Sequence, residues 1–169
     1  FDGPYYAHPT AKEVEKMQQK LQLAIANEKW PDPRRRLVIA GKQSDKMWGM
    51  VSWYWISEET NWPAVGIGIY DPAIWGRGIG WEALGLWSDY LFAAMPEIVR
   101  LDLRTWSGNR GMMRLAEKLG YRLEACFRRA RVVDGRHYDG LGYGILREEW
   151  HVLHPQGFSH TLQGEGDLK

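Results

Sequence analysis

The sequence predicts one α+β domain, and three observations support that fold class. The chain has 169 residues, the size of a single ordinary domain, and 44% of them are apolar, which is enough to form a core. Its first half contains three segments of strand character joined by short loops, as in an antiparallel meander. Its second half alternates helix and strand patterns and ends in a hairpin. We find no internal repeat and no long linker, so we expect residues 1–150 to form the domain and residues 151–169 to be a tail that is ordered only in part.

The composition excludes several classes of protein. Lys and Arg number 22 against 21 Asp and Glu, and this balance argues against a dedicated nucleic-acid-binding protein. The single cysteine, Cys126, cannot form an internal disulfide, which favours a reducing, cytoplasmic location. No apolar run approaches the roughly 18 residues that span a bilayer, and the chain begins without the features of a signal peptide. Ten tryptophans exclude a disordered chain, and we expect no metal site, no membrane contact and no nucleic-acid partner.

The beginning of the chain predicts a long amphipathic helix. Thr10 and Glu13 have the spacing of a capping box, and apolar residues recur after them at helical intervals. We expect the helix to run to about Lys29, because the prolines of residues 30–33 stop it. The apolar stripe consists of Val14, Met17, Leu21 and Ile25.

The remaining elements follow from alternation and from turn residues. Strands are predicted over 36–40, 47–57 and 62–70, with turns at 41–45 and 58–61. A helix over 81–95, a strand over 98–103 and a helix that begins at Gly108-Asn109 and ends at Leu119-Gly120 come next. Asp134-Gly135 then forms the turn of a hairpin between strands 121–133 and 136–146.

A glycine-rich loop, W-G-R-G-I-G over residues 75–80, lies between a predicted strand and a predicted helix. Glycines let several backbone N–H groups converge, and a helix N-terminus attracts an anion, so the loop suits a diphosphate. A tight turn without a ligand explains the same pattern. From Gly78 to Ala83 the segment also matches the dinucleotide fingerprint, with Asp102 about 20 residues further on. The three strands before the loop and the hairpin after it argue against a dinucleotide oxidoreductase.

Further motifs follow the loop in order. It continues as G-I-G-x-E-A-L over 78–84, and Asn109 is followed eleven residues later by Gly120-Tyr121. The closing pattern consists of Arg128, Asp134-Gly135, Tyr138, Asp139 and Glu149-Trp150. In these motifs the stretch from about residue 64 to residue 150 resembles the GNAT superfamily of N-acetyltransferases, in particular its ribosomal-protein alanine acetyltransferases. Trp75 replaces the Gln or Arg that begins the family's loop, and the family's first strand and helix are thin or absent in this chain.

The resemblance implies a GNAT fold, in which a mixed, mostly antiparallel central sheet is flanked by helices and splayed between its two central strands. It implies acetyl-CoA as cofactor, with the pyrophosphate on the amides of residues 77–80 and the pantetheine arm paired like a strand with residues 67–69. Asn109 would hold the pantetheine or cap its helix, and Arg114 would meet the 3′-phosphate or belong to a solvated helix face. The cofactor-binding candidates are Ile67, Gly68, Ile69, Trp75, Gly76, Arg77, Gly78, Ile79, Gly80, Asn109 and Arg114.

The implied reaction is attack on the thioester by a primary amine, which belongs to a protein N-terminus, a peptide or a small molecule. It requires a base, an oxyanion donor and an acid for the leaving thiolate. The positions at which relatives place an acid hold Ala116 and Met112, and no carboxylate stands at the start of the central strand. The catalytic candidates are Ser107, Glu58 and Glu59. Each of them can also be an ordinary loop or turn residue without a catalytic role. The alternative function is a CoA-binding sensor or interaction domain with weak or no catalysis.

Four tryptophans are candidates for the walls of an acceptor pocket. Trp53 and Trp55 share one face of a predicted strand, because side chains alternate with a period of two. Trp62 opens the next strand and Trp106 ends the strand expected to line the acetyl group. Together they suit an apolar or cationic amine, and core packing is the alternative for each. The resembled group commonly pairs, so a homodimer is expected.

Overall fold

A computed structural model describes residues 10–27, 30–41 and 46–166 of the chain. Its helices and strands are α1 (Ala11–Ala26), β1 (Arg36–Ala40), β2 (Met47–Ser57), β3 (Trp62–Ile69), the short 3-10 helix η1 (Pro72–Ile74), α2 (Ile79–Ala94), β4 (Arg100–Trp106), α3 (Arg110–Lys118), β5 (Arg122–Val133), β6 (Arg136–Leu146), α4 (Arg147–Leu153) and α5 (Phe158–Gly166). The predicted helix end at Lys29 and most of the predicted turn at 41–45 lie outside the described residues.

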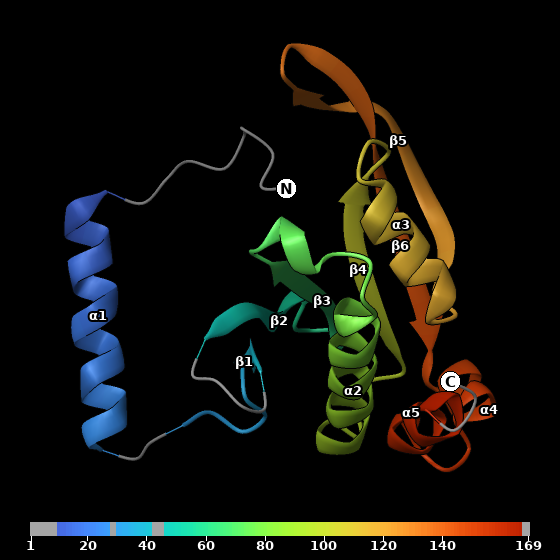
Figure 1. Cartoon of the computed structure of the whole chain (residues 1–169), viewed down its shortest axis with the longest axis horizontal. Helices are drawn as coiled ribbons and strands as arrows, with labels where there is room; N and C mark the ends of the chain where they lie inside the picture. The colour runs from blue at the N-terminus through green and yellow to red at the C-terminus, as the bar shows by residue number, and fades with distance from the viewer. Residues whose placement is uncertain (1–9, 28–29, 42–45, 167–169) are drawn as a thin grey trace.

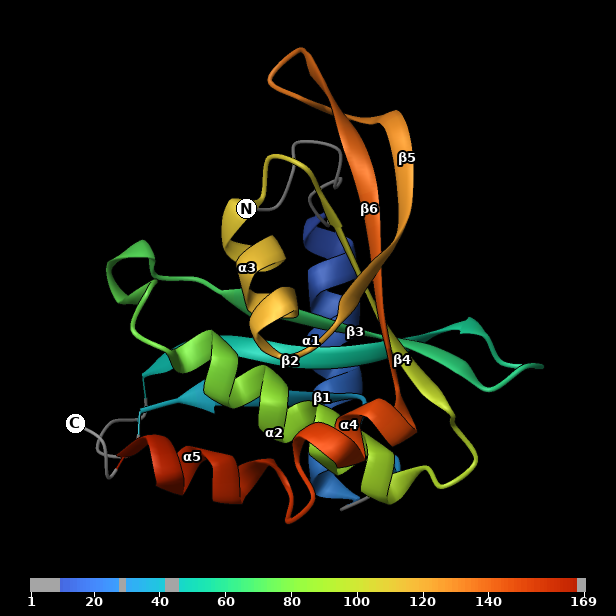
Figure 2. The same ribbon diagram turned by 90° about the vertical axis from the view of Figure 1, so that its right-hand side faces the viewer.

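The strands form one six-stranded sheet in the order β1-β2-β3-β4-β6-β5. Neighbouring strands are antiparallel except for the central pair, β3 and β4, which are parallel. Two helices, α2 and α3, cover one face of the sheet, and the hairpin of β5 and β6 extends beyond the rest of it (Figures 1 and 2). The predicted α+β fold with a mostly antiparallel sheet is confirmed.

The two central strands separate after a short contact. β3 and β4 are paired only through Ala64 with Asp102 and Val65 with Leu103. Beyond these pairs, β3 continues to Ile69 along β2, and β4 continues to Trp106 along β6. One edge of each strand is therefore unpaired beyond the contact, and the sheet is splayed as the resemblance implies. β4 also starts and ends later than the predicted strand 98–103, because the residues that pair with β6 run from Arg100 to Trp106.

The core lies between the sheet and the helices α2, α3 and α5. On β6, Leu141, Tyr143 and Ile145 point into it, and the alternate residues are glycines. α2 contributes Leu84, Trp87 and Leu91, all nearly inaccessible to solvent. Alternation along β6 thus gives the sheet an apolar face under the helices and a second face lined by Gly140, Gly142 and Gly144.

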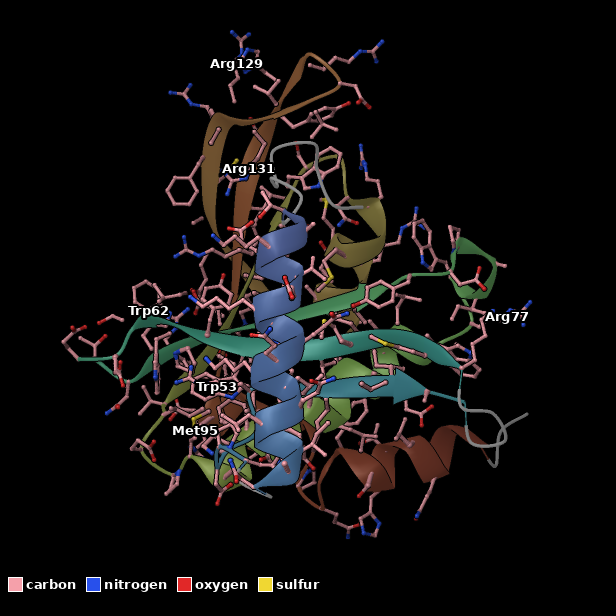
Figure 3. All side chains as sticks on the ribbon, turned by 90° about the vertical axis from the view of Figure 1, so that its left-hand side faces the viewer. Trp53, Trp62, Arg77, Met95, Arg129 and Arg131 are labelled. Atoms are coloured by element: carbon pink, nitrogen blue, oxygen red, sulfur yellow. The ribbon has the colours of Figure 1, made fainter. Side chains whose placement is uncertain are left out.

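The first helix stands apart from this core. Thr10 and Glu13 form the predicted capping box, and none of the helix's residues is buried. Met17, Leu21 and Ile25 are each more than half exposed. α1 lies in front of the sheet face opposite to α2, as Figure 3 shows. The periodicity correctly predicts the helix, but its apolar stripe does not pack into the core.

The segment after Trp150 is more structured than the sequence analysis expects. Its described part contains the end of α4 and all of α5 rather than an irregular tail. Phe158 is fully buried, and its ring centroid lies 4.9 Å from that of Trp81 and 5.8 Å from that of Trp150. Asp89 of α2 accepts hydrogen bonds from the Trp150 indole (2.9 Å) and the Phe158 backbone (3.0 Å). One buried phenylalanine and one carboxylate therefore fix this segment to α2.

Within the part of the chain that the structure describes, no helix has the length and apolar character needed to cross a bilayer. The same residues contain no group of three or more His, Cys, Asp or Glu side chains placed to hold a metal ion.

Candidate functional site

The glycine-rich loop has the backbone conformation that its sequence predicts. Gly76 has φ +75° and Gly78 has φ +83°, values that side chains disfavour, although a methyl group at either position would meet no atom within 4 Å. Gly78 is the N-cap of α2, and its carbonyl accepts the first helical bond, from Glu82 (3.0 Å). The N–H groups of the first turn, including those of Ile79 and Gly80, have no carbonyl of the helix to bind. The loop therefore presents donors and the positive end of the helix dipole to the same space.

The loop is fixed to the end of β3. The indole N–H of Trp75 donates to the carbonyl of Ile69 (3.0 Å), and 45% of the Trp75 side chain is exposed. Asp71 caps η1 by accepting from the N–H of Ala73 (2.9 Å), and this bond, followed by that from Lys46, lowers the pKa of the Asp71 carboxyl group. The residue that departs from the family pattern thus joins the loop to the strand.

The free edge of β3 leads directly to this loop. Between Gly66 and Ile69 the strand is bonded to β2 on one side, and its other side faces the splay. β2 approaches Gly68 so closely that a side chain at Gly49 would collide with the Gly68 carbonyl. The structure therefore brings together the predicted strand edge, residues 67–69, and the predicted anion loop, residues 76–80, on one arm of the splay.

Asn109 serves as a helix cap in the structure. Its side-chain oxygen accepts from the N–H of Met112 (3.1 Å), which closes the first turn of α3. α3 lies beside α2, since a methyl group at Gly80 would lie 3.4 Å from Leu115. Arg114 is exposed on α3, and Nζ of Lys118 lies 4.1 Å from the centroid of the Trp81 ring. The second role suggested for Asn109, at the pantetheine, stays a prediction.

The three catalytic candidates do not converge. Ser107 follows β4 and is held to β6: its N–H donates to the Asp139 carbonyl (2.9 Å), and its Oγ accepts from the Asp139 N–H (3.0 Å). Glu58 and Glu59 lie exposed in the turn before β3, at the end of that strand opposite to the splay. Hydrogen bonds from its own N–H and from the Ser57 hydroxyl lower the pKa of Glu59. Ser107 and the two glutamates therefore belong to different ends of the sheet.

The four tryptophans divide between the two faces of the sheet. Trp53 is 5% exposed in the core, and Trp55 lies edge-on to it with ring centroids 5.0 Å apart. The indole of Trp53 donates to the Arg34 carbonyl (2.8 Å). Trp62 and Trp106 lie on the opposite, glycine-lined face by their strand positions, and each has a buried indole Nε1 without a partner among the described residues. The four rings therefore do not line a single pocket.

Asp102 is a candidate that the sequence analysis considered only for a dinucleotide site. It pairs with Ala64 at the closed end of the splay, and it is the one buried carboxylate in the described part of the chain. Arg100 Nε donates to its Oδ1 (2.7 Å), and Arg100 also pairs with Glu124. Burial acts to lower the pKa of Arg100, but its bonds to Glu124 and Asp102 raise it above the ordinary value. The alternation R-L-D-L-R over 100–104 is the signal that sets Asp102 opposite to the core.

Solved structures with the same fold are found among acetyltransferases. Mutant forms of the spermidine/spermine N-acetyltransferase SpeG from Vibrio cholerae match at a TM-score of 0.69 and 17% identity, covering 91% of this chain and 89% of that one. RimJ from Mycobacterium smegmatis, in complex with CoA-disulfide, matches at 0.66 and 20% identity, covering 92% and 69%. A ribosomal-protein alanine acetyltransferase from Vibrio fischeri matches at 0.67 and 17% identity, covering 88% and 81%. At these identities the similarity shows the fold alone.

Sequence comparison adds the family. An uncharacterized N-acetyltransferase of Bacillus subtilis, the prophage-derived YokL, is 24% identical over 116 residues. These residues are 69% of this chain, which spans 64% of the length of that relative. The family model described as an acetyltransferase (GNAT) domain matches residues 3–122, well over half of the chain. With its splayed sheet and its glycine loop at the start of α2, the chain belongs to the GNAT acetyltransferase family.

Proposed function

We propose that this chain transfers an acetyl group from acetyl-CoA to a primary amine of a protein N-terminus, a peptide or a small molecule. The observation that supports this most is the unpaired edge of β3 beyond Val65, which leads to the glycine loop at the start of α2. An extended arm with amide groups can bind such an edge by strand-like hydrogen bonds. A diphosphate can bind the loop amides at the helix N-terminus. The bound RimJ ligand, a CoA disulfide, supports the same choice of donor.

The chemistry requires that the amine attack the thioester carbonyl. The C–N bond forms and the C–S bond breaks, and the proton that the ammonium group loses ends on the thiolate. Backbone N–H groups of residues 66–68 supply donors for the oxyanion. In this proposal Asp102 attracts the ammonium group and accepts its proton, and its position at the closed end of the splay supports that role. Ser107 and the glutamates at 58 and 59 lie farther along the strands and are the alternative candidates.

A CoA-binding domain without catalysis is the second candidate function. Where relatives of the resembled group carry a proton donor, this chain has Ala116 and Met112, and Ala116 is fully buried in α3. Neither side chain can protonate a leaving thiolate. A domain that only binds CoA and signals through it would keep the glycine loop but would need no proton donor at these two positions.

Release of free thiol separates the two functions. The protein is incubated with acetyl-CoA and a panel of amines containing peptides, polyamines and small aromatic amines, and CoA binding is measured by calorimetry. Thiol release that depends on one amine class supports the transferase. Tight CoA binding without release across the panel supports the binding domain, and absence of both overturns the two together.

A cytoplasmic location and a homodimer complete the proposal. The single cysteine, Cys126, is exposed on β5, which is compatible with a reducing compartment. β1 and β5 are the two edge strands of the sheet and offer unpaired backbone for a second copy. Sedimentation of the purified chain tests the dimer.

A further inference from the structure

The sheet face that carries Gly140, Gly142 and Gly144, called the glycine face below, has an uneven distribution of charge. Residues paired across strands share a face, so Asp102, Arg104 and Trp106 of β4 lie on it opposite the three glycines. Because glycines occupy β6 there, the long side chains of the neighbouring strands extend over β6. The face is opposite to α2 and α3, and α1 stands in front of it without a buried residue (Figure 3).

Near the closed end of the splay, the glycine face is negative. Arg100 lies between Asp102 and Glu124. Arg122, which is paired with Gly144, forms an ion pair with Glu149, so that two positive charges meet three negative charges. Gly144 makes this arrangement possible, because a side chain there would collide with the Arg100 guanidinium group and with the Glu124 carboxylate. A net negative group beside the splay attracts an ammonium ion.

Farther along β4 the same face is positive. Arg104 is exposed opposite Gly142, and the guanidinium carbon of Arg131 lies 3.9 Å from where a side chain of Gly140 would begin. In the irregular stretch of β5 between Phe127 and Arg131, where no strand pairing assigns a face, Arg128 and Arg129 line an open cavity of about 820 Å³ together with Phe127 and Asp139. Figure 3 shows Arg129 at the end of the hairpin and Arg131 farther down it. This set, Arg104, Arg128, Arg129 and Arg131, is called the arginine end; Asp139 is the carboxylate in its cavity.

Two tryptophans supply further donors on this face. The indole Nε1 atoms of Trp62 and Trp106 are buried and have no acceptor among the described residues. A buried N–H without an acceptor costs free energy, which a ligand carbonyl or carboxylate would recover. A polyamine in its charged form has only donors and positive charges, so it can neither accept from these indoles nor pair with arginine side chains.

From this layout we infer that the acceptor is an acidic polypeptide segment, whose free amine lies at Asp102 and whose carboxylates lie at the arginine end. The four residue steps from Asp102 to Trp106 span about 13 Å of strand, which equals about four residue steps of an extended peptide. Carboxylates are therefore expected about three to five residues after the reacting amine. The inference rests on the proposed function and names the substrate class of that site.

Peptides of equal length that differ only in charge test this inference. One carries a Glu pair about four residues after the free N-terminus, the second carries a Lys pair there, and the third carries the Glu pair about nine residues after it. Binding is measured by fluorescence anisotropy with CoA present, and turnover by thiol release, with spermidine as a further acceptor. We expect kcat/KM and affinity to be at least about tenfold higher for the first peptide than for the other two, and the difference to shrink as salt rises.

A pair of variants assigns the effect to the arginine end. Arg104→Gln combined with Arg128→Gln should reduce the preference for the first peptide to about threefold or less. Arg36→Gln removes an exposed charge from β1, three strands away from β4, and should keep the preference. The expected split between the two variants would not arise from a general loss of positive charge.

Several results would overturn the inference. They are equal binding of the Glu and Lys peptides, a preference for spermidine, and displacement of the Glu peptide by a single-stranded RNA of higher affinity. If no amine causes release of free thiol from acetyl-CoA, the proposed transferase activity is refuted. The anisotropy comparison still decides whether the glycine face binds an acidic segment.

Discussion

Replacing Gly78 by Ala tests whether the backbone of the glycine loop binds CoA. At φ +83° a residue with a side chain pays about 1–2 kcal/mol, and the added methyl group meets no atom within 4 Å, so strain is the whole perturbation. If the loop stays in place, stability falls by that amount. If the loop relaxes instead, its amides no longer converge and CoA affinity falls by about 5- to 30-fold.

Gly135→Ala is the matched control for this experiment. Gly135 has φ +73° and equally open surroundings, but it lies in the hairpin turn far along the chain from the loop. Both variants are measured by thermal unfolding and by calorimetric titration with CoA. Gly135→Ala should lose about 2–4 °C per kcal/mol of strain and keep its CoA affinity. The reasoning fails if Gly78→Ala binds CoA as tightly as Gly135→Ala does and unfolds at the wild-type temperature.

Three further predictions concern the base, the C-terminal segment and pH. Asp102→Asn should lower kcat/KM by about 100-fold with CoA affinity nearly unchanged, whereas a larger loss in Glu59→Gln would move the base to the turn before β3. Phe158→Ala should cost about 3–5 kcal/mol in denaturant unfolding, and Leu153→Ala, which truncates a half-exposed side chain, about 1 kcal/mol or less. Burial lowers the pKa of His154 below 6.5, so the unfolded chain binds the proton more tightly and stability falls as pH drops below about 6.5. The unfolding temperature of His154→Asn should depend less on pH in that window, and an unchanged pH profile would contradict the assignment.

The features that depend on local backbone chemistry are predictable from the sequence. The positive φ angles of Gly76 and Gly78 follow from a glycine pattern between strand and helix, and the turn at Asp134-Gly135 follows from its two residues. The helix α1 follows from its capping box and its periodicity. Whether the apolar stripe of α1 packs against another element depends on how the rest of the chain folds. The periodicity of the stripe alone does not predict this contact.

Features that depend on pairing between distant segments were not predictable in this way. Asp102 gains its position from the contact of β3 with β4, and those strands are separated in the sequence by η1 and α2. Phe158 is buried because Trp81 and Trp150 surround it, although its own neighbours in the sequence are polar or small. The sequence groups Trp62 with Trp53 and Trp55, but Trp62 lies by alternation on the same face as Ala64, whereas Trp53 is paired with Val65 on the other face. In each case the missing information is which strand or helix lies opposite.

The two halves of the proposed site differ in what they require of the sequence. The CoA cradle consists of backbone: an unpaired strand edge, loop amides and two glycines with positive φ. Such a cradle tolerates a changed side chain, and Trp75 even contributes a hydrogen bond to it. Proton transfer and acceptor recognition need side chains, and α3 offers Met112 and Ala116 where relatives of the resembled group have donors. Asp102, the proposed base, lies instead on the glycine face. Cofactor binding and chemistry are therefore expected to be separable: a Gly78 variant should weaken CoA binding more than turnover of bound CoA, and an Asp102 variant should do the reverse.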